Sequence, residues 1–384
     1  MSQNLLITNC RLFDAAEAEQ TTSILIENGI IRQIGQIEPS DHNNKLDAEG
    51  KIIAPGFIDV HIQGAGGCDV LDATAEALTT ISRTCARYGT TGFLATTVFK
   101  PDQPNHHLSL AARHKDINPS GASILGIHLE GPFISMEKKG MIQPDSICSP
   151  SMKVLEQIHQ VTDGTLKMMT IAPELTESLQ IIKALVSSGV IASFGHSSAT
   201  YEQTLEGFDA GISHVTHLFN AMPSLHHRAP GPLVAIFSNP SVSVQMITDG
   251  VHLHPAVMKL AYEILGADRI IPITDGIQAM GLPDGRYNYN GVEYESKEGA
   301  GRYADGTLIG TSLSLNLILK RFVQFTGCPF ETAIKVVTEN PAKLLGIEDR
   351  KGSIAIGKDA DLVLVDREFT VYATIIEGNI VYEK

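Results

Sequence analysis

Apolar residues in the middle of the chain recur in short runs, separated by stretches with the spacing of amphipathic helices. The runs predict eight strands, at 57–62, 91–98, 123–129, 166–172, 190–195, 212–218, 242–248 and 270–274. Helical patterns between them are clearest at 71–88, 176–188, 200–210 and 255–265, and weaker at 102–114 and 151–160. Eight strand-then-helix units predict a (β/α)8 barrel. The competing architecture, a doubly wound open sheet, is disfavoured because no Gly-x-Gly-x-x-Gly follows the first strand.

The two ends of the chain carry a different pattern, of short strands and tight turns. The N-terminal candidates are 4–13, 23–27, 30–34 and 51–54, with a hairpin signal at Asn28-Gly29. The C-terminal candidates are 360–365, 370–376 and 380–382. Because neither end has enough strands to bury a core alone, we expect one small β-sandwich built from both termini. The expected domains are therefore 1–54 plus 347–384 for the sandwich and 55–346 for the barrel.

Two late segments interrupt the strand–helix rhythm. Residues 284–309 are rich in Gly and Tyr and predict a β-hairpin insertion after the eighth strand. Asn340-Pro341 predicts the start of the last helix, with Asn340 as its N-cap.

Composition narrows the classes of function. The chain has 384 residues, a formal net charge of -14 and 5 scattered cysteines with no Cys-x-x-Cys pair. The negative charge argues against a nucleic-acid partner. The sequence contains no apolar run of about 18 residues, so no membrane span is predicted. The first residues lack the pattern of a signal peptide, and the cysteines suggest neither disulfides nor a thiolate metal site. We therefore expect a cytoplasmic enzyme.

Polar residues stand where the predicted barrel strands end. They are His61 and Gln63, Glu130, His196, His217, Asp249 and His252, and Asp275. In a parallel barrel the carboxyl ends of the strands form one rim, where catalytic groups collect. Any one of these residues is more simply explained as a hydrogen-bonding residue. So many on one rim indicate a functional site.

Glutamate with two histidines is a ligand set suited to a catalytic Zn2+. A metal of this kind polarises a carbonyl and acidifies water, and an unligated aspartate can take and return a proton. Alternation along the sixth strand separates His217 from His214, which we expect to point the other way and to be structural. His128 shares a face with Glu130 but lies deeper, which indicates a core residue or one behind the ligands.

Five segments resemble known proteins. Residues 54–61 (APGFIDVH) resemble the first barrel strand of the amidohydrolase superfamily. Four more resemble the N-acetylglucosamine-6-phosphate deacetylase family, namely 128–133 (HLEGPF), 195–197 (GHS), 217–222 (HLFNAM) and 249–252 (DGVH). HLFNAM is the most specific, and the likeness runs in order over nearly the whole chain. It implies a (β/α)8 barrel with a β-sandwich, and metal-dependent hydrolysis of N-acetylglucosamine 6-phosphate to glucosamine 6-phosphate and acetate in amino-sugar catabolism.

The resemblance also implies roles for the matching residues. Glu130, His196 and His217 would bind one divalent metal ion, expected to be Zn2+. Asp275 would be the general base and then the general acid, and His252 would hydrogen-bond the acetyl carbonyl. Substrate contacts are implied for Met141, Asn220, Ala221, Arg228, Asp249, Gly250, Val251, His252, Leu308, Ile309, Gly310 and Thr311. Asn220, Ala221 and Arg228 would lie at the sugar phosphate, with Arg228 serving the neighbouring subunit of a homodimer.

Two departures from the family pattern affect these expectations. Superfamily members with two metals carry His-x-His on the first strand, whereas this chain has His61-Ile62-Gln63. Because glutamine is a weak ligand for a transition metal, we expect a second metal site at His61 and Gln63 to be weak or absent. In the loop after Glu130, Ile142 replaces a histidine of the family, so the epimer of the sugar stays open.

Other functions remain as alternatives. One is a deacetylase of N-acetylgalactosamine 6-phosphate, and another is a different amidohydrolase. A dihydroorotase-type enzyme is disfavoured because the fourth strand ends at 171–174 (IAPE) without the lysine of those enzymes. The third is a metal-free barrel used as a scaffold, against which the full ligand set and Asp275 argue.

Overall fold

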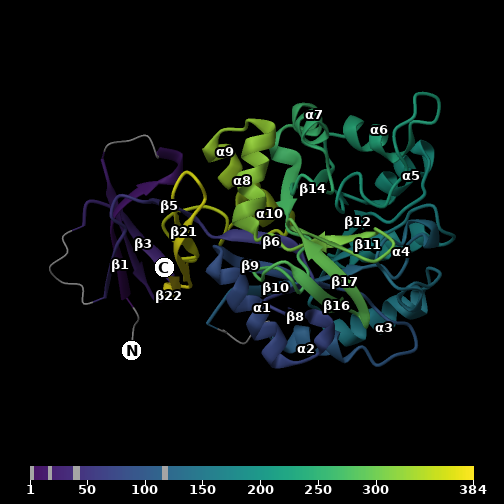
Figure 1. The fold of residues 1–384 in the computed structure, drawn as a ribbon, viewed down its shortest axis with the longest axis horizontal. Helices are drawn as coiled ribbons and strands as arrows, with labels where there is room; N and C mark the ends of the chain where they lie inside the picture. Colours follow the sequence, from purple (N-terminus) through teal and green to yellow (C-terminus); the bar gives the residue numbers. More distant parts are fainter. Residues whose placement is uncertain (1–3, 16–19, 38–43, 115–119) are drawn as a thin grey trace.

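Eight parallel strands form a central barrel in the structure, a computed structural model that describes residues 4–15, 20–37, 44–114 and 120–384. Around the sheet they are β6 (Phe57–Ile62), β9 (Thr90–Thr97), β10 (Ser123–Glu130), β11 (Leu166–Ile171), β12 (Ile191–Phe194), β13 (His214–Val215), β14 (Ser243–Ile247) and β15 (Ile270–Ile273). A parallel bridge between Ile62 and Gly276 joins the first strand to the end of the last. The predicted (β/α)8 barrel is confirmed, with a strand at each expected position (Figure 1).

Helices cover the outside of the barrel (Figure 1). They are α1 (Ala75–Arg87), α2 (His106–His114), α3 (Met152–Thr162), α4 (Ser178–Ser187), α5 (Tyr201–Ala210), α6 (Gly231–Ser238), α7 (Pro255–Leu265) and α8 (Leu315–Thr326). α1 illustrates why they form, because Leu78, Ile81 and Cys85 repeat at helical spacing and are all buried in the main core. Its first turn is capped by Thr74, whose side chain accepts a hydrogen bond from the Ala77 N–H.

The amino ends of the strands are closed by α9 (Phe330–Val336) and α10 (Glu339–Leu344). Ala342 of α10 packs in one buried cluster with Ile58, Leu94 and Met168. The prediction that Asn340 caps this helix is wrong, because the N-cap is Thr338. Asn340 lies inside the first turn, and its amide nitrogen donates to the carbonyls of Ala267 and Ile270 at 2.8 and 2.9 Å. These two hydrogen bonds, instead of a capping role, explain why an asparagine suits this position.

Both termini contribute to a second β unit. It contains β1 (Asn4–Leu12), β2 (Thr22–Glu27), β3 (Ile30–Gly35), β4 (Lys45–Asp47), β5 (Ile52–Pro55), β20 (Leu362–Val365), β21 (Val371–Ile376) and β22 (Asn379–Glu383). β1 belongs to both halves, because its first part pairs with β2 and β4 and its last residues pair with β5. Side chains of both halves, such as Ile24 and Leu364, share one core. This confirms the β-sandwich built from both termini (Figure 1), while the expected domain boundaries stay a prediction.

The insertion after the eighth strand is larger than the expected hairpin. It is a four-stranded antiparallel sheet of β16 (Gly285–Tyr289), β17 (Val292–Lys297), β18 (Ala300–Arg302) and β19 (Leu308–Thr311). A bridge between Gly276 and Thr311 attaches its last strand directly to the end of β15. Its inner face packs Tyr289 and Ile309 against Met141. A short ribbon, β7 (Gly64–Ala65) with β8 (Cys68–Asp69), follows β6.

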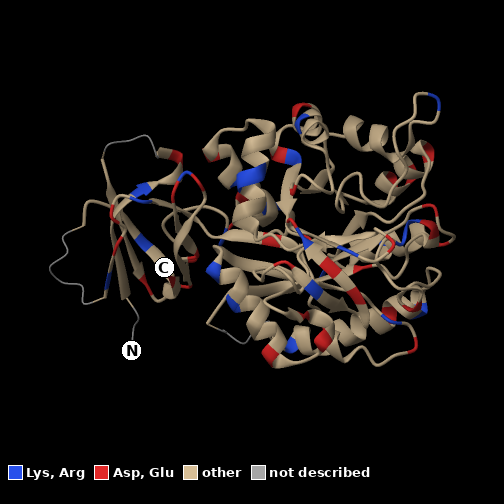
Figure 2. Ribbon diagram, in the orientation of Figure 1, with Lys and Arg blue, Asp and Glu red and all other residues tan. Residues whose placement is uncertain are grey.

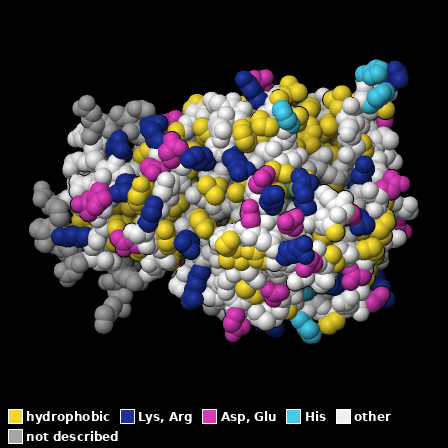
Figure 3. Space-filling model, viewed as in Figure 1, with side chains coloured by type: hydrophobic (Ala, Val, Ile, Leu, Met, Phe, Trp, Pro, Cys, Tyr) yellow, Lys and Arg dark blue, Asp and Glu magenta, His cyan; other side chains and the backbone are white. Residues whose placement is uncertain are grey.

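Charged residues lie mainly on helices and loops, and the barrel strands are mostly free of them (Figure 2). On the face seen in Figure 3, acidic and basic side chains are interspersed with apolar ones. None of the helices in the described residues is long and apolar enough to cross a bilayer.

Candidate active site

The polar residues expected on one rim meet at the carboxyl ends of the barrel strands. Glu130 is the last residue of β10, and His196, His217 and Asp275 each follow the last residue of their strand by two positions. These three residues have φ values of 47°, 27° and 47°, which are uncommon for residues other than glycine. Backbone strain of this kind collects at functional sites, where it aims side chains that regular strands cannot aim.

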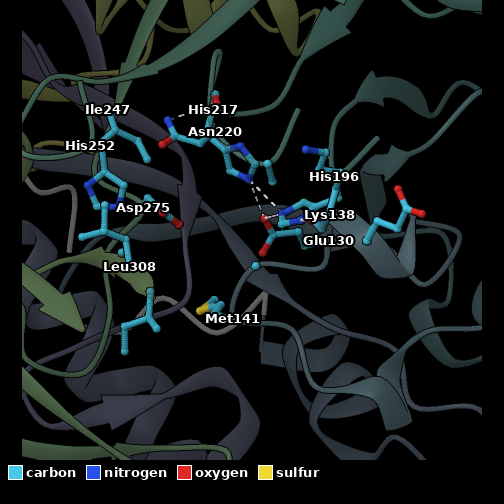
Figure 4. Close-up of a pocket in the computed structure, with 15 residues that line it drawn as sticks. Glu130, Lys138, Met141, His196, His217, Asn220, Ile247, His252, Asp275 and Leu308 are labelled. Atoms are coloured by element: carbon cyan, nitrogen blue, oxygen red, sulfur yellow. Dashed lines mark hydrogen bonds and ion pairs between the residues drawn. The ribbon is translucent and has the colours of Figure 1, made fainter. Parts of the chain in front are cut away.

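Three donor atoms converge at the centre of this rim. The Nε2 atoms of His196 and His217 each lie 2.9 Å from Oε1 of Glu130 and 3.0 Å from one another (Figure 4). The three side chains are buried, and they form the group of possible metal ligands found in the described residues. The sequence placed all three on the rim, and the structure brings them together.

The protonation states of Glu130, His196 and His217 leave lone pairs free at this centre. Burial raises the pKa of Glu130, but the His61 charge and the close approach of the His196 and His217 rings outweigh it and hold that pKa well below its ordinary value. Burial lowers the pKa of His217, which favours the neutral ring. The other nitrogen of His196, Nδ1, donates to the Lys138 carbonyl at 2.7 Å, so the Nε2 of a neutral ring carries a lone pair.

A divalent cation fits this set of donors. Two imidazole nitrogens 3.0 Å apart cannot both carry a proton towards one another. A cation bound between them accepts both lone pairs, and the negative charge of the Glu130 carboxylate attracts it. Donor atoms around a tetrahedral Zn2+ lie about 3.3 Å apart, so these ligands need to separate only slightly to bind one.

At His61 and Gln63, where a second metal site was expected to be weak or absent, the side chains contact other residues of the protein. The Gln63 amide nitrogen lies 3.4 Å from Oε2 of Glu130 and 3.3 Å from Oδ1 of Asp275. His61 Nε2 lies 3.2 Å from the same Asp275 oxygen. Burial lowers the pKa of His61, but the charges of Glu130 and Asp275 outweigh it and raise that pKa to about 9. A protonated ring and an amide N–H therefore face the position where a second cation would need lone pairs.

His252 is held by its neighbour Asp249. Its Nδ1 lies 2.6 Å from Oδ2 of Asp249, whose other oxygen accepts from the backbone N–H groups of Val251 and His252. Burial raises the pKa of Asp249, but the contact with His252 outweighs it and keeps that pKa below its ordinary value. The carboxylate thus fixes the ring through Nδ1 and leaves Nε2 available to a ligand.

A cavity of about 300 Å³ opens above these residues, between β19, the loop after β10 and the loop after β13. Of the residues expected to contact substrate or metal, it is lined by Glu130, Met141, His196, His217, Asn220, Ala221, His252, Asp275, Leu308, Ile309 and Gly310. The expected residues outside the lining are His61, Gln63, Arg228, Asp249, Gly250, Val251 and Thr311. Arg228 is exposed, and its guanidinium contacts the ring of His227 at 2.7 Å.

Comparison with known proteins identifies the family. The sequence model of the amidohydrolase family matches residues 52–381. The chain belongs to the amidohydrolase family.

Deacetylases of N-acetylated sugar phosphates are similar over most or all of the chain. An N-acetylglucosamine-6-phosphate deacetylase of Bacillus subtilis (strain 168) is 35% identical over 100% of this chain and 98% of its own. An N-acetylgalactosamine-6-phosphate deacetylase of Escherichia coli O157:H7 is 35% identical over 92% of this chain and 93% of its own. Among solved structures, a mutant N-acetyl-D-glucosamine-6-phosphate deacetylase of Mycobacterium smegmatis in complex with N-acetyl-D-glucosamine-6-phosphate gives a TM-score of 0.88, with 31% identity over 99% of both chains.

The histidines judged structural lie beneath this amidohydrolase site. His128 Nε2 lies 2.9 Å from the Thr170 hydroxyl, and His214 Nδ1 lies 2.7 Å from the Ser243 hydroxyl. Both rings are fully buried, and burial with the nearby His61 charge lowers the pKa of each. They form a neutral polar layer under the ligands, outside the group that converges on Glu130.

Sequence reasoning missed a carboxylate that supports the candidate metal ligand His196. Glu174, three residues after β11, accepts hydrogen bonds from the Ser197 hydroxyl at 2.7 Å and the Ser198 N–H at 2.6 Å. Ser197 directly follows His196, so Glu174 fixes the loop that carries this ligand. Its position just beyond the end of the fourth strand was the available signal.

The loop after β10 also has more contacts with the site than expected. Glu137 and Lys138, from a short helical turn at Met136–Lys138, line the cavity. Ile142, where the resemblance implied a histidine, is fully buried against Val98 and Ile134 and is outside the cavity lining.

Proposed function

We propose that this amidohydrolase removes the acetyl group from N-acetylglucosamine 6-phosphate, giving glucosamine 6-phosphate and acetate in amino-sugar catabolism. The observation that carries the proposal is the buried group Glu130, His196 and His217 beside Asp275, in a cavity large enough for a sugar phosphate. Full-length similarity to N-acetylglucosamine-6-phosphate deacetylases supports the substrate.

Glu130, His196 and His217 would hold one divalent metal ion, which we propose is Zn2+ because two imidazoles and a carboxylate suit it. The metal would supply a Lewis acid that polarises the acetamide carbonyl and acidifies water. The hydrogen bonds of Gln63 to Glu130 and Asp275 favour a single metal, because an amide N–H repels a cation where a second ligand would be needed.

Asp275 is proposed as the general base and then the general acid. Its carboxylate is nine-tenths buried, lines the cavity, and is held by His61 on one side. It takes a proton from the attacking water as the acetyl carbonyl becomes tetrahedral. It then gives the proton to the amide nitrogen, because an unprotonated amine is a very poor leaving group.

His252 is proposed to stabilise the developing negative charge on the acetyl oxygen. Asp249 holds its ring by Nδ1, so Nε2 faces the reacting group without a conformational search. A well-placed donor of this kind lowers the barrier by about 3–4 kcal/mol.

The sugar and its phosphate would extend away from the metal ligands. We propose that Leu308, Ile309 and Gly310 contact the sugar and that Asn220 and Ala221 contact the phosphate. Arg228 is exposed and outside the cavity of its own chain, which suits a residue that reaches the phosphate of a neighbouring subunit in a homodimer. A cytoplasmic location would suit the free cysteines.

The test is acetate release from a panel of N-acetylhexosamines, with and without a 6-phosphate, on protein whose metal content is measured. Preferred turnover of N-acetylglucosamine 6-phosphate is expected, with one metal ion per chain. Preference for the galacto epimer would favour the second candidate, which the similarity to an N-acetylgalactosamine-6-phosphate deacetylase supports. No acetate from any sugar phosphate would refute both.

A further inference from the structure

The cavity carries few positive charges for a pocket that takes a phosphate. Its lining contains three carboxylates, Glu130, Glu137 and Asp275, and a single lysine or arginine, Lys138. A metal ion offsets the carboxylates near the acetyl group but does not reach a phosphate at the other end of the sugar. If the proposed function holds, the doubly charged phosphate of the substrate must enter a pocket in which Lys138 is the single lysine or arginine of the lining.

Lys138 is mounted on a loop that is fastened to a proposed metal ligand. Its carbonyl accepts the hydrogen bond from His196 Nδ1 at 2.7 Å, and its N–H donates to the Ser135 carbonyl at 3.0 Å. The Ser135 N–H in turn donates to the His196 carbonyl at 2.8 Å. The backbone of Lys138 is thus fixed on both sides, and the side chain starts from a defined point on the cavity wall (Figure 4).

The same hydrogen-bonded series leads to the proposed phosphate residues. Ser197, next to His196, donates its N–H to the Ala221 carbonyl at 3.1 Å. The loops of Lys138, His196 and Ala221 therefore adjoin one another around one part of the cavity. The Lys138 side chain is half-buried, and its ammonium group forms no ion pair or hydrogen bond with another described residue. The neighbouring Lys139 differs, because its ammonium group donates to the Gly140 carbonyl and is outside the cavity lining.

We propose that the Lys138 ammonium group binds the 6-phosphate of the substrate from within the same chain, and that it determines the preference for phosphorylated over unphosphorylated amino sugars. This proposal rests on the proposed function. An ammonium group is a compact point charge on a flexible stem, which suits a phosphate whose position varies slightly between sugars. The contact is made equally in the ground state and the transition state, so its loss raises KM more than it lowers kcat.

The test compares Lys138→Met with Lys139→Met, which removes one positive charge from the adjacent position outside the cavity. For wild type and both variants, kcat and KM are measured on N-acetylglucosamine 6-phosphate and on N-acetylglucosamine. Lys138→Met is expected to reduce the preference for the phosphorylated sugar by about 10- to 100-fold, mainly through KM. Lys139→Met should keep the wild-type preference. Metal content and melting temperature serve as folding controls, because only the backbone of Lys138 contacts His196.

A binding measurement separates this proposal from the proposed function. The dissociation constant of glucosamine 6-phosphate is measured by calorimetry on the metal-loaded wild type and both variants. If the wild type releases no acetate but binds the sugar phosphate through Lys138, the function fails and the phosphate contact stands. If the wild type is an active deacetylase and Lys138→Met leaves both the preference and the dissociation constant unchanged, the contact is refuted. Absence of sugar-phosphate binding to the wild type refutes both.

Discussion

Removing the Glu174 carboxylate tests whether the loop after β12 prepares His196 for the metal. Glu174→Ala leaves the Ser198 N–H and the Ser197 hydroxyl without the acceptors that now lie 2.6 and 2.7 Å away. His196 sits at a φ of 47°, which an unsupported loop abandons readily. The variant should therefore fold normally but hold His196 in several positions.

The expected size of the effect follows from those two bonds. A hydrogen bond to a charged group contributes about 1.5–3 kcal/mol, and water replaces part of it because Glu174 is only half-buried. Loss of a group that orients a metal ligand typically weakens binding by about 10- to 100-fold. We expect the Zn2+ dissociation constant of Glu174→Ala to rise by about 30-fold, or about 2 kcal/mol. Glu174→Gln should cost much less, because its amide can accept from Ser198 and donate to Ser197.

Competition with a chelator of known affinity measures the Zn2+ dissociation constant directly. Glu177→Ala is the matched control, because it removes the same charge from an exposed position on the same loop. Equal affinities for Glu174→Ala and wild type would refute the idea that this carboxylate prepares the ligand. An equal loss in Glu177→Ala would reduce the effect to general electrostatics.

Three further outcomes test two site residues and one buried carboxyl group outside the cavity lining. Asp275→Asn should keep its metal, measured by elemental analysis, but lose about 10²–10⁴-fold in kcat, and substantial turnover would contradict the proton-transfer role. Gln63→His should bind a second equivalent of metal, and an unchanged count would contradict the single-site explanation. Burial raises the pKa of Asp69 from 3.8 to about 7, so its folded state keeps a proton and stability falls as pH rises between these values. Above about pH 7, the free energy of unfolding of Asp69→Asn, measured in urea, should therefore exceed that of wild type by up to about 4 kcal/mol. No gain is expected near pH 4, and parallel pH profiles for the two proteins would contradict this reasoning.

The barrel and the candidate site were predictable because both depend on strand ends. Apolar runs located every barrel strand, and polar residues just beyond them, such as Glu130 and Asp275, had to share a rim once the sheet was parallel. Strand alternation was a weaker guide at β13, which has only the two residues His214 and Val215. The orientation of His217 is set by its left-handed backbone after the strand has ended.

Contacts made by loops were beyond the sequence. Glu174 and Lys138 act through hydrogen bonds to residues from other loops, and no local pattern marks these partners. Asn340 was assigned as a cap because Asn-Pro commonly opens a helix, but tertiary acceptors determined its place. Short apolar helices such as α6 lack the polar face on which periodicity depends.

The pairing of β5 with β20 constrains how the chain assembles during synthesis. Residues Ile52–Pro55 find their partners Leu362–Val365 only after the whole barrel has been made. At about 5–20 residues per second, translation leaves the edge of β5 unpaired for roughly 15–60 s. During that time the N-terminal strands present an open edge with Ile52, Ile53 and Ala54, all buried in the final structure. A chain that lacks β20 would therefore have its barrel segments but leave this edge of β5 exposed, where it can pair with another chain and aggregate.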